Sequence, residues 1–487
     1  MSLLRKHLEL VSVLIAAIPM VVVFRNLWAQ FTMWPMTDVL THAVKLHFFQ
    51  TIGWGGLTQQ WNYGVGYVLF ATYPPGFFLI AFPIMQFLQW VNVSQTILPA
   101  MMVSAFLLVV GIIFLVHRFL VKNFFQTIIL VSLVFFNPLS INWLFETGRF
   151  PELTGWFFFI PILGMIIHHF NKPLSWNELF WIGFLFSLLM ISHPAVFTMA
   201  LLAWGIFSVL TFTNNSWKNS TPILLSVLLS SPWLIPYFQA KKDLLLSTYV
   251  GYHLEASYIF TNFFHVVSVI ILLFLAFRSR DQSHPLSGWW TSHAVLGVIT
   301  LLGIPALIPF FNQPHQVTYV TYFFLIGIHG ILSAHPAFTR GIIHRAVPFL
   351  VLLFLLTSVY SAAKFVDFAG ERDIHTLYGS EIDTLPSFIE SPLTCYPECG
   401  GELSYWVIND AISSTDNFSP EATPITIARN RESLSRGMET GDCTTIRLSL
   451  QNLQTKTLLA YPAFCPTLES CGFSTQETNH WCISPVP

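Results

Sequence analysis

Three side chains that could take part in chemistry lie at helical spacing early in the chain: the carboxylate of Asp38, the imidazole of His42 and the ammonium group of Lys45. The spacing is i, i+4 and i+7, so a helix capped by Thr37 would place all three side chains on one face. They would then face one cleft, where the carboxylate could act as an acid or a base. A structural interpretation stays open: Asp38 complements the helix N-terminus, His42 is interfacial and Lys45 extends toward water.

A second group of candidates lies in the segment 146–152, which reads Glu-Thr-Gly-Arg-Phe-Pro-Glu. Gly148 and Pro151 favour a tight turn, which would hold the neighbouring side chains in fixed directions. Arg149 and Glu152 are therefore candidates for binding a substrate or a phosphate group. The alternative is that these charges only form salt bridges that anchor the loop.

The composition indicates a polytopic membrane protein. Of the 487 residues, 54% are hydrophobic and 9% are charged, whereas soluble domains carry about 25% charged residues. The mean hydropathy of +0.62 agrees. Residues 1–366 contain 16 basic and 8 acidic residues, and residues 367–487 contain 6 and 16. These values exclude a soluble enzyme, a nucleic-acid binder and a single-span receptor.

Eleven apolar stretches have about the length that spans a bilayer. They run over residues 8–27, 97–116, 124–145, 153–170, 178–193, 195–213, 221–238, 259–277, 293–311, 317–335 and 346–366. With the N-terminus inside, every inner loop carries a basic residue, as the positive-inside rule requires. Lys241 and Lys242 are exceptions to the rule, because this orientation places them in an outer loop. There they could bind a phosphate. The first stretch lacks a signal-peptide cleavage site, so we expect an uncleaved span.

One further apolar stretch, Pro74–Trp90, is predicted to lie in the outer leaflet without crossing it. If it crossed, all later loops would invert and the charge rule would fail repeatedly. We therefore expect residues 29–96 to form a long outer loop with in-plane helices. The predicted spans carry no charged residue at depth, which argues against an ion-coupled transporter.

Residues 367–487 are predicted to form a small α/β domain outside the membrane. All of the cysteines lie there: Cys395, Cys399, Cys443, Cys465, Cys471 and Cys482. Six cysteines in an oxidising compartment predict up to three disulfides, with 15 possible pairings, and a structural zinc site is the alternative. We expect strands at Pro424–Ala428 and Leu458–Tyr461, and helices at Glu402–Ile412 and Thr444–Leu453.

The order of these features resembles the GT-C superfamily of polytopic membrane glycosyltransferases, which use polyprenyl-phosphate-linked sugars. An Asp follows the first span in the sequence Trp-Pro-Met-Thr-Asp at 34–38, and Tyr-Pro-Pro follows at 73–75 in the long first outer loop. The second outer loop carries Arg149 and Glu152, and an external C-terminal domain completes the pattern. The segment 148–152 is most similar to the poorly characterised bacterial and archaeal members.

The resemblance implies an all-α membrane domain followed by an extracytoplasmic domain, in the cytoplasmic membrane. The implied activity is transfer of a sugar from a polyprenyl-phosphate donor to an acceptor hydroxyl at the extracytoplasmic face. Asp38 would be the catalytic base. Arg149 would bind the leaving phosphate, with Lys241, Lys242 or His42 as further ligands and Glu152 as a substrate-binding group.

The implied partners are the donor lipid, membrane lipid and a glycan, lipid or protein acceptor, with no nucleic acid. No cofactor follows with certainty. Members with a divalent metal usually carry Asp where this chain has Glu152, so we assign no metal ligand. The alternative function is a non-catalytic lipid or polysaccharide carrier, or an assembly partner, built on the same fold.

Overall fold

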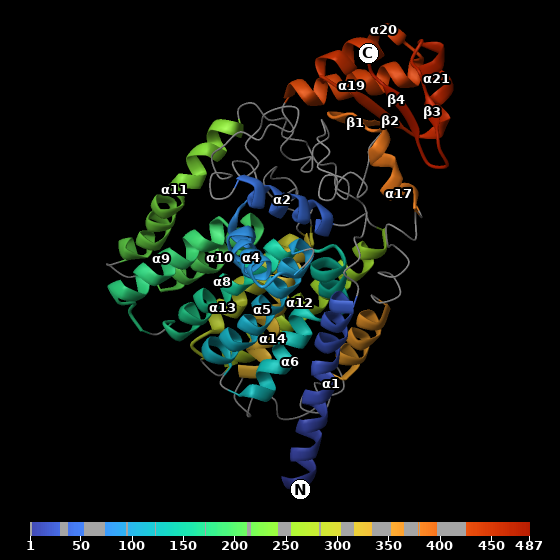
Figure 1. Ribbon diagram of the computed structural model, residues 1–487. Coiled ribbons are helices and arrows are strands. Elements are labelled where there is room, and N and C mark those ends of the chain that lie inside the picture. The colour runs from blue at the N-terminus through green and yellow to red at the C-terminus, as the bar shows by residue number, and fades with distance from the viewer. Residues whose placement is uncertain are drawn as a thin grey trace. The chain divides into compact units, whose positions relative to one another are not determined.

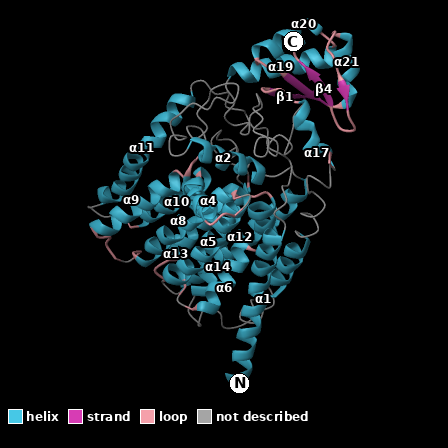
Figure 2. Cartoon of the chain, viewed as in Figure 1, coloured by secondary structure: helices cyan, strands magenta, loops and turns pink. Residues whose placement is uncertain are grey.

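The computed structural model describes residues 2–29, 38–52, 74–93, 96–121, 123–170, 172–211, 216–241, 255–281, 284–302, 316–333, 352–364, 378, 380–396 and 425–487. These residues are mostly helical, and their strands all lie in the C-terminal part of the chain (Figures 1 and 2). The chain divides into two compact units. Unit 1 comprises residues 1–29, 102–231 and 249–367, and unit 2 comprises residues 30–101, 232–248 and 368–487.

Helices occupy at least part of each predicted apolar stretch. Their bounds are α1 Ser2–Ala29, α5 Ile97–Leu115, α6 Phe124–Phe135, α7 Pro138–Ser140, α8 Phe150–His168, α9 Trp176–Met190, α10 Pro194–Leu210, α11 Thr221–Lys241, α12 Glu255–Asp281, α13 Ser287–Leu301 and α14 Gln316–Ser333. A further apolar helix covers Leu352–Lys364.

Within the described ranges, four helices are long and apolar enough to cross a membrane: Ile97–Leu120, Phe150–His168, Lys218–Phe238 and Phe263–Arg280. The bent pair between Phe124 and Phe145 adds a fifth if its two helices form one broken span, and none if they form a re-entrant loop. The total of eleven crossings and their direction remain predictions.

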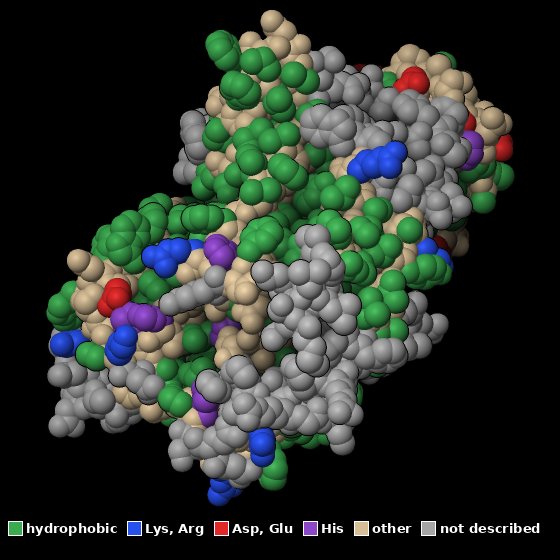
Figure 3. Space-filling view, turned by 90° about the horizontal axis from the view of Figure 1, so that it is seen from below, with side chains coloured by type: hydrophobic (Ala, Val, Ile, Leu, Met, Phe, Trp, Pro, Cys, Tyr) green, Lys and Arg blue, Asp and Glu red, His purple; other side chains and the backbone are tan. Residues whose placement is uncertain are grey.

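The outer surface of these helices is rich in apolar side chains. On α11, Leu224 and Leu228 are 67% and 68% exposed. Hydrophobic side chains cover much of the described surface in Figure 3, and Lys and Arg occupy separate small areas. An apolar surface of this extent is unfavourable in water and is expected where lipid covers the protein.

The chain bends by 56° between α6 and the helical segment that follows it. Asn137 lies at the bend: its side-chain nitrogen donates to the carbonyls of Leu133 and Val134, each at 2.9 Å. Its side-chain oxygen accepts from the backbone N–H of Ser140, which starts the next turn. The chain then continues as a π-helical segment over Ile141–Glu146, a wide helix form that is common near functional sites.

Helix α8 packs against α9 and α10 in unit 1, and α12 packs against α13 and α14. Gly155 permits close approach on α8, because a Cβ atom there would lie 2.9 Å from the Cβ of His193, just before α10. His193 is the N-cap of α10, and Pro194 occupies the first turn, where proline is favoured.

In unit 2, helix α2 covers Asp38–Ile52 and helix α4 covers Gly76–Trp90. The two helices pack against each other. Helix α2 begins at Asp38, as the spacing of its polar residues predicted, although Thr37 lies outside the described residues. Helix α4 begins directly after Pro74 and Pro75, so the predicted helix start is confirmed, whereas its in-plane orientation is still a prediction.

The C-terminal region of unit 2, residues 380–396 and 425–487, contains the described strands (Figure 2). Its elements are α17 Glu381–Thr384, β1 Leu393–Tyr396, α19 Ile425–Thr440, α20 Cys443–Asn452, β2 Thr457–Ala460, α21 Cys465–Ser470, β3 Gln476–Glu477 and β4 Cys482–Pro485. The sheet order is β1-β2-β4-β3. Strands β1 and β2 are parallel and the other pairs are antiparallel.

The expected small α/β fold of this region is confirmed in outline. Strand β2 matches the strand predicted at 458–461, and α20 matches the helix predicted at 444–453. The strand predicted at Pro424–Ala428 is wrong, because α19 begins at Ile425. Residues 402–412 lie outside the described part of the chain.

The segment that begins at Ile425 is helical because its apolar residues follow a helical pattern over more than ten residues, beyond the five residues predicted as a strand. Ile427, Leu434 and Met438 are all buried in the core of the region, at positions i, i+7 and i+11 of one helical face. A buried face of three turns outweighs the strand preference of a few β-branched residues at its start.

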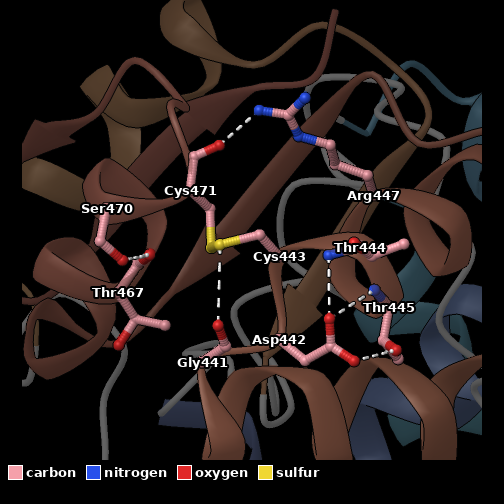
Figure 4. The surroundings of a disulfide bond; sticks show 9 residues. All are labelled: Gly441, Asp442, Cys443, Thr444, Thr445, Arg447, Thr467, Ser470 and Cys471. Atoms are coloured by element: carbon pink, nitrogen blue, oxygen red, sulfur yellow. Dashed lines mark hydrogen bonds between the residues drawn. A yellow bond between two sulfur atoms is a disulfide. The ribbon is translucent and has the colours of Figure 1, made fainter.

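Two disulfides connect helices and strands of the C-terminal region. Cys443 pairs with Cys471, and Cys465 pairs with Cys482. Cys395 is also disulfide-bonded, so the zinc alternative does not apply to these cysteines. Near the first bridge, the Asp442 carboxylate caps α20, and Arg447 donates to the carbonyl of Cys471 at 2.5 Å (Figure 4).

Candidate functional site

The segment around Arg149 forms the tight turn that its sequence predicted. Gly148 has φ +76°, a conformation that glycine adopts without strain. The N–H of Phe150 donates to the Gly148 carbonyl at 2.8 Å, and the N–H of Glu152 donates to the Arg149 carbonyl at 3.0 Å. Helix α8 begins directly afterwards, with Pro151 in its first turn. The turn therefore fixes the backbone from which the Arg149 and Glu152 side chains extend.

The Glu152 carboxylate lies inside unit 1, with 1% of the residue exposed. Its Oε2 accepts a hydrogen bond from the indole N–H of Trp143 at 2.8 Å. Its Oε1 accepts from the Trp156 indole at 3.2 Å and from the Thr318 hydroxyl at 2.8 Å. A buried carboxylate is costly unless donors surround it. Glu152 therefore joins the segment 141–146, α8 and α14 at one point.

Arg149 lies on the face of the same indole. Its Cζ atom is 3.7 Å from the centroid of the Trp143 ring, within the range of a favourable cation–π contact. Trp143 thus contacts an anion with its N–H edge and a cation with its π face. The predicted Arg149–Glu152 cluster exists, and the indole of Trp143 links its two charges.

His193 is the fourth polar group near the carboxylate. Its Nδ1 accepts the backbone N–H of Val196 at 3.4 Å, so the ring proton of the neutral form resides on Nε2. Nε2 lies 3.9 Å from Glu152 Oε2. Gly155 lets His193 approach α8 closely, so the His193 ring lies near the carboxylate.

The other sequence candidates belong to unit 2. Asp38 is half-buried at the start of α2, and His42 and Lys45 on the same helix are 3% and 2% exposed. The His42 ring packs edge-on against Phe78 of α4, with centroids 5.9 Å apart. Lys45 is thus buried within the protein rather than extended into water.

The remaining basic candidates are described only in part. Lys241 is the last residue of α11, and its side chain lies outside the described part of the chain. Lys242 lies outside the described residues altogether. Among the side chains that are described, no three His, Cys, Asp or Glu residues are grouped closely enough to hold a metal ion.

The sequence did not single out Trp143, Trp156 or Thr318. A Trp in an apolar stretch is ordinarily read as core or interface, and Thr318 is 166 residues away from Glu152. One signal was available: Trp143 and Glu152 flank the turn at nine residues' separation. Indole is a donor without an acceptor, so a carboxylate nearby is its natural partner in an apolar surrounding.

Comparison with solved structures shows the fold. ArnT from Cupriavidus metallidurans in the apo state matches with a TM-score of 0.59 at 11% identity, over 98% of this chain and 97% of that chain. The same protein bound to undecaprenyl phosphate matches with a TM-score of 0.54 at 11% identity, over 98% of both chains. The apo Archaeoglobus fulgidus oligosaccharyltransferase matches with a TM-score of 0.56 at 11% identity, over 97% of this chain and 71% of that one.

These structures are GT-C glycosyltransferases, so the chain has a GT-C-like fold, as its motifs predicted. At this level of identity the likeness concerns the fold alone. No family model and no curated protein matches the sequence.

Proposed function

We propose that this protein is a membrane glycosyltransferase that transfers a sugar from a polyprenyl-phosphate donor to an acceptor hydroxyl at the extracytoplasmic face. The observation that carries the proposal is the GT-C-like fold along nearly the whole chain, shared with an ArnT structure that holds undecaprenyl phosphate. The apolar surface of the helices supports a lipid-linked donor, since a polyprenyl chain is stable only against lipid or apolar side chains.

In the proposed reaction the acceptor oxygen attacks the anomeric carbon of the sugar. A bond forms between these two atoms while the bond from the anomeric carbon to the phosphate oxygen breaks. Asp38 takes the proton of the acceptor hydroxyl, and the electron pair of the broken bond leaves with the polyprenyl phosphate. The half-buried position of Asp38 at the start of α2 is compatible with a carboxylate that reaches a bound hydroxyl.

Negative charge grows on the phosphate as it leaves, and a cation held at that place lowers the barrier. We propose Arg149 for this role, because its guanidinium is always charged and its N–H groups fit two phosphate oxygens at once. Its contact with Trp143 supports the role, because a fixed cation needs no reorganisation when the charge develops. Lys241, Lys242 and His42 are kept as further candidate ligands.

The test is a release assay with purified protein in detergent and a panel of undecaprenyl-phosphate sugars. Mass spectrometry would follow free undecaprenyl phosphate. We expect Asp38→Asn to lower release by about 10²–10⁴-fold and Arg149→Gln by about 10²–10³-fold. Glu432→Gln is a charge-neutralising control, because Glu432 is an exposed residue paired with Arg436 on α19.

Full activity of Asp38→Asn would contradict the assignment of the base. If wild-type protein bound undecaprenyl phosphate but released none from any donor and acceptor pair, a carrier or assembly role would replace the transferase.

A further inference from the structure

We infer that Glu152 is a positioning residue that acts through Trp143: it fixes the indole on which Arg149 lies, which makes Trp143 part of the phosphate-binding site. The inference rests on the proposed function and assigns Glu152 a role other than substrate contact. It also adds a residue, Trp143, that neither the motifs nor the fold comparison nominated.

The Glu152 carboxylate is already occupied by protein donors. Its two oxygens accept three hydrogen bonds, from Trp143, Trp156 and Thr318. A carboxylate has about four acceptor positions, and His193 Nε2 lies 3.9 Å from Oε2. With 1% of the residue exposed, a substrate would have to displace buried protein donors to reach it.

Trp143 contacts Glu152 and Arg149 with different parts of its ring. The N–H edge of the indole is held 2.8 Å from Oε2, while Arg149 Cζ lies 3.7 Å from the ring centroid on its face. The bond to the carboxylate restrains rotation of the ring about its side-chain torsions, and so it holds the surface under the guanidinium in place. Donation to an anion also increases the electron density of the ring, which strengthens its attraction for a cation.

Trp143 also connects the two opposite charges of the cluster. The indole of Trp143 meets the Glu152 carboxylate at its N–H edge and the Arg149 guanidinium on its face. The carboxylate therefore lies near enough to offset part of the positive charge, and it holds the ring rather than the guanidinium itself.

Two tryptophans that bind the same carboxylate allow the positioning role to be tested with matched variants. Trp143 and Trp156 both donate an indole N–H to Glu152, and of these two described rings Trp143 is the one that carries the guanidinium. Trp143→Phe and Trp156→Phe therefore each remove one hydrogen bond to the same carboxylate and keep an aromatic ring. A merely structural role of Glu152 would make the two variants behave alike.

The full-length protein in detergent would be titrated with undecaprenyl phosphate, with Arg149→Ala as the reference. We expect Trp143→Phe to raise the dissociation constant by about 10-fold, within the range of a cation–π contact, and Trp156→Phe to change it by less than about 2-fold. In turnover, Trp143→Phe should lower kcat more than it raises KM for the donor, because the charge on the phosphate is largest in the transition state.

A second readout needs no substrate. Phenylglyoxal modifies accessible guanidinium groups, and peptide mass spectrometry would give the rate at Arg149. We expect faster modification in Trp143→Phe than in Trp156→Phe. Equal rates and equal dissociation constants in the two variants would overturn the positioning role while the function stands. If Arg149→Ala binds undecaprenyl phosphate as tightly as wild type, the proposed role of Arg149 fails and this inference fails with it.

Discussion

The surroundings of Glu152 and the C-terminal region are held together by different chemistry. Around Glu152, one carboxylate connects segments that lie up to 166 residues apart in sequence, through three hydrogen bonds. In the C-terminal region, Cys443–Cys471 and Cys465–Cys482 close loops of 28 and 17 residues. The first region has a single buried anion and the second has covalent bonds.

The difference follows from the solvent that each region displaces. Inside a bundle of apolar helices no water competes for the donors of Trp143, Trp156 and Thr318, so one acceptor can hold all three. The C-terminal region is small, and ion pairs on its surface, such as that between Arg436 and Glu432, contribute little because they face water. A small core of this kind commonly depends on disulfides.

The largest effect should come from Glu152→Ala, because it leaves three buried donors without their acceptor. We expect a loss of about 3–6 kcal/mol in the free energy of unfolding, at one to two per donor, measured by denaturant titration in detergent. Glu152→Gln, which keeps one oxygen acceptor, should lose less. If the alanine variant were as stable as the wild type, the hydrogen bonds to the Glu152 carboxylate would not contribute to the free energy of unfolding.

A somewhat smaller effect is expected from removing the Cys465–Cys482 bridge in the double variant Cys465→Ser with Cys482→Ser. A loop of this length contributes about 3 kcal/mol through the unfolded state. Limited proteolysis should cleave the C-terminal region faster in the variant than in the wild type. The rate of cleavage within unit 1 should be unchanged, because all cysteines lie after residue 394. A parallel loss in both regions would remove the contrast between them.

The smallest effect concerns the surface pair of Glu381 and His480. The Glu381 Oε2 lies 2.7 Å from His480 Nδ1. Burial raises the pKa of the Glu381 carboxyl, but hydrogen bonds from Thr478 and His480 outweigh it and leave that pKa below its ordinary value of 4.5.

A carboxyl pKa that is lower in the folded state stabilises the fold above the unfolded pKa, and this stability is lost as pH falls through the folded pKa. We therefore expect the C-terminal region to lose less than about 1 kcal/mol on acidification below pH 4.5 through this group. Glu381→Gln should remove that part of the acid dependence in thermal unfolding curves. An unchanged acid dependence in the variant would mean that the pair contributes nothing.

Local patterns predicted the helices well and the contacts between them poorly. The apolar stretches, the turn at Gly148 and the start of α2 at Asp38 follow from residue type and spacing within a few positions. The bond from Thr318 to Glu152 depends on how α14 packs against α8, which no short window of sequence contains. The strand expected at 424–428 failed for a related reason, since residues as distant as Met438 decide that the segment is helical.

The π-helical segment Ile141–Glu146 places Trp143 where its N–H meets Glu152. A π-helical turn contains one residue more than an α-helical turn that covers the same distance. It therefore depends on the number of residues in the segment as well as on their types. Deleting one residue there would restore α-helical register and turn Trp143 by about 100°. Homologues should therefore be aligned by the number of residues between the Trp and the Glu, because a sequence that keeps both but shifts that count has lost the contact.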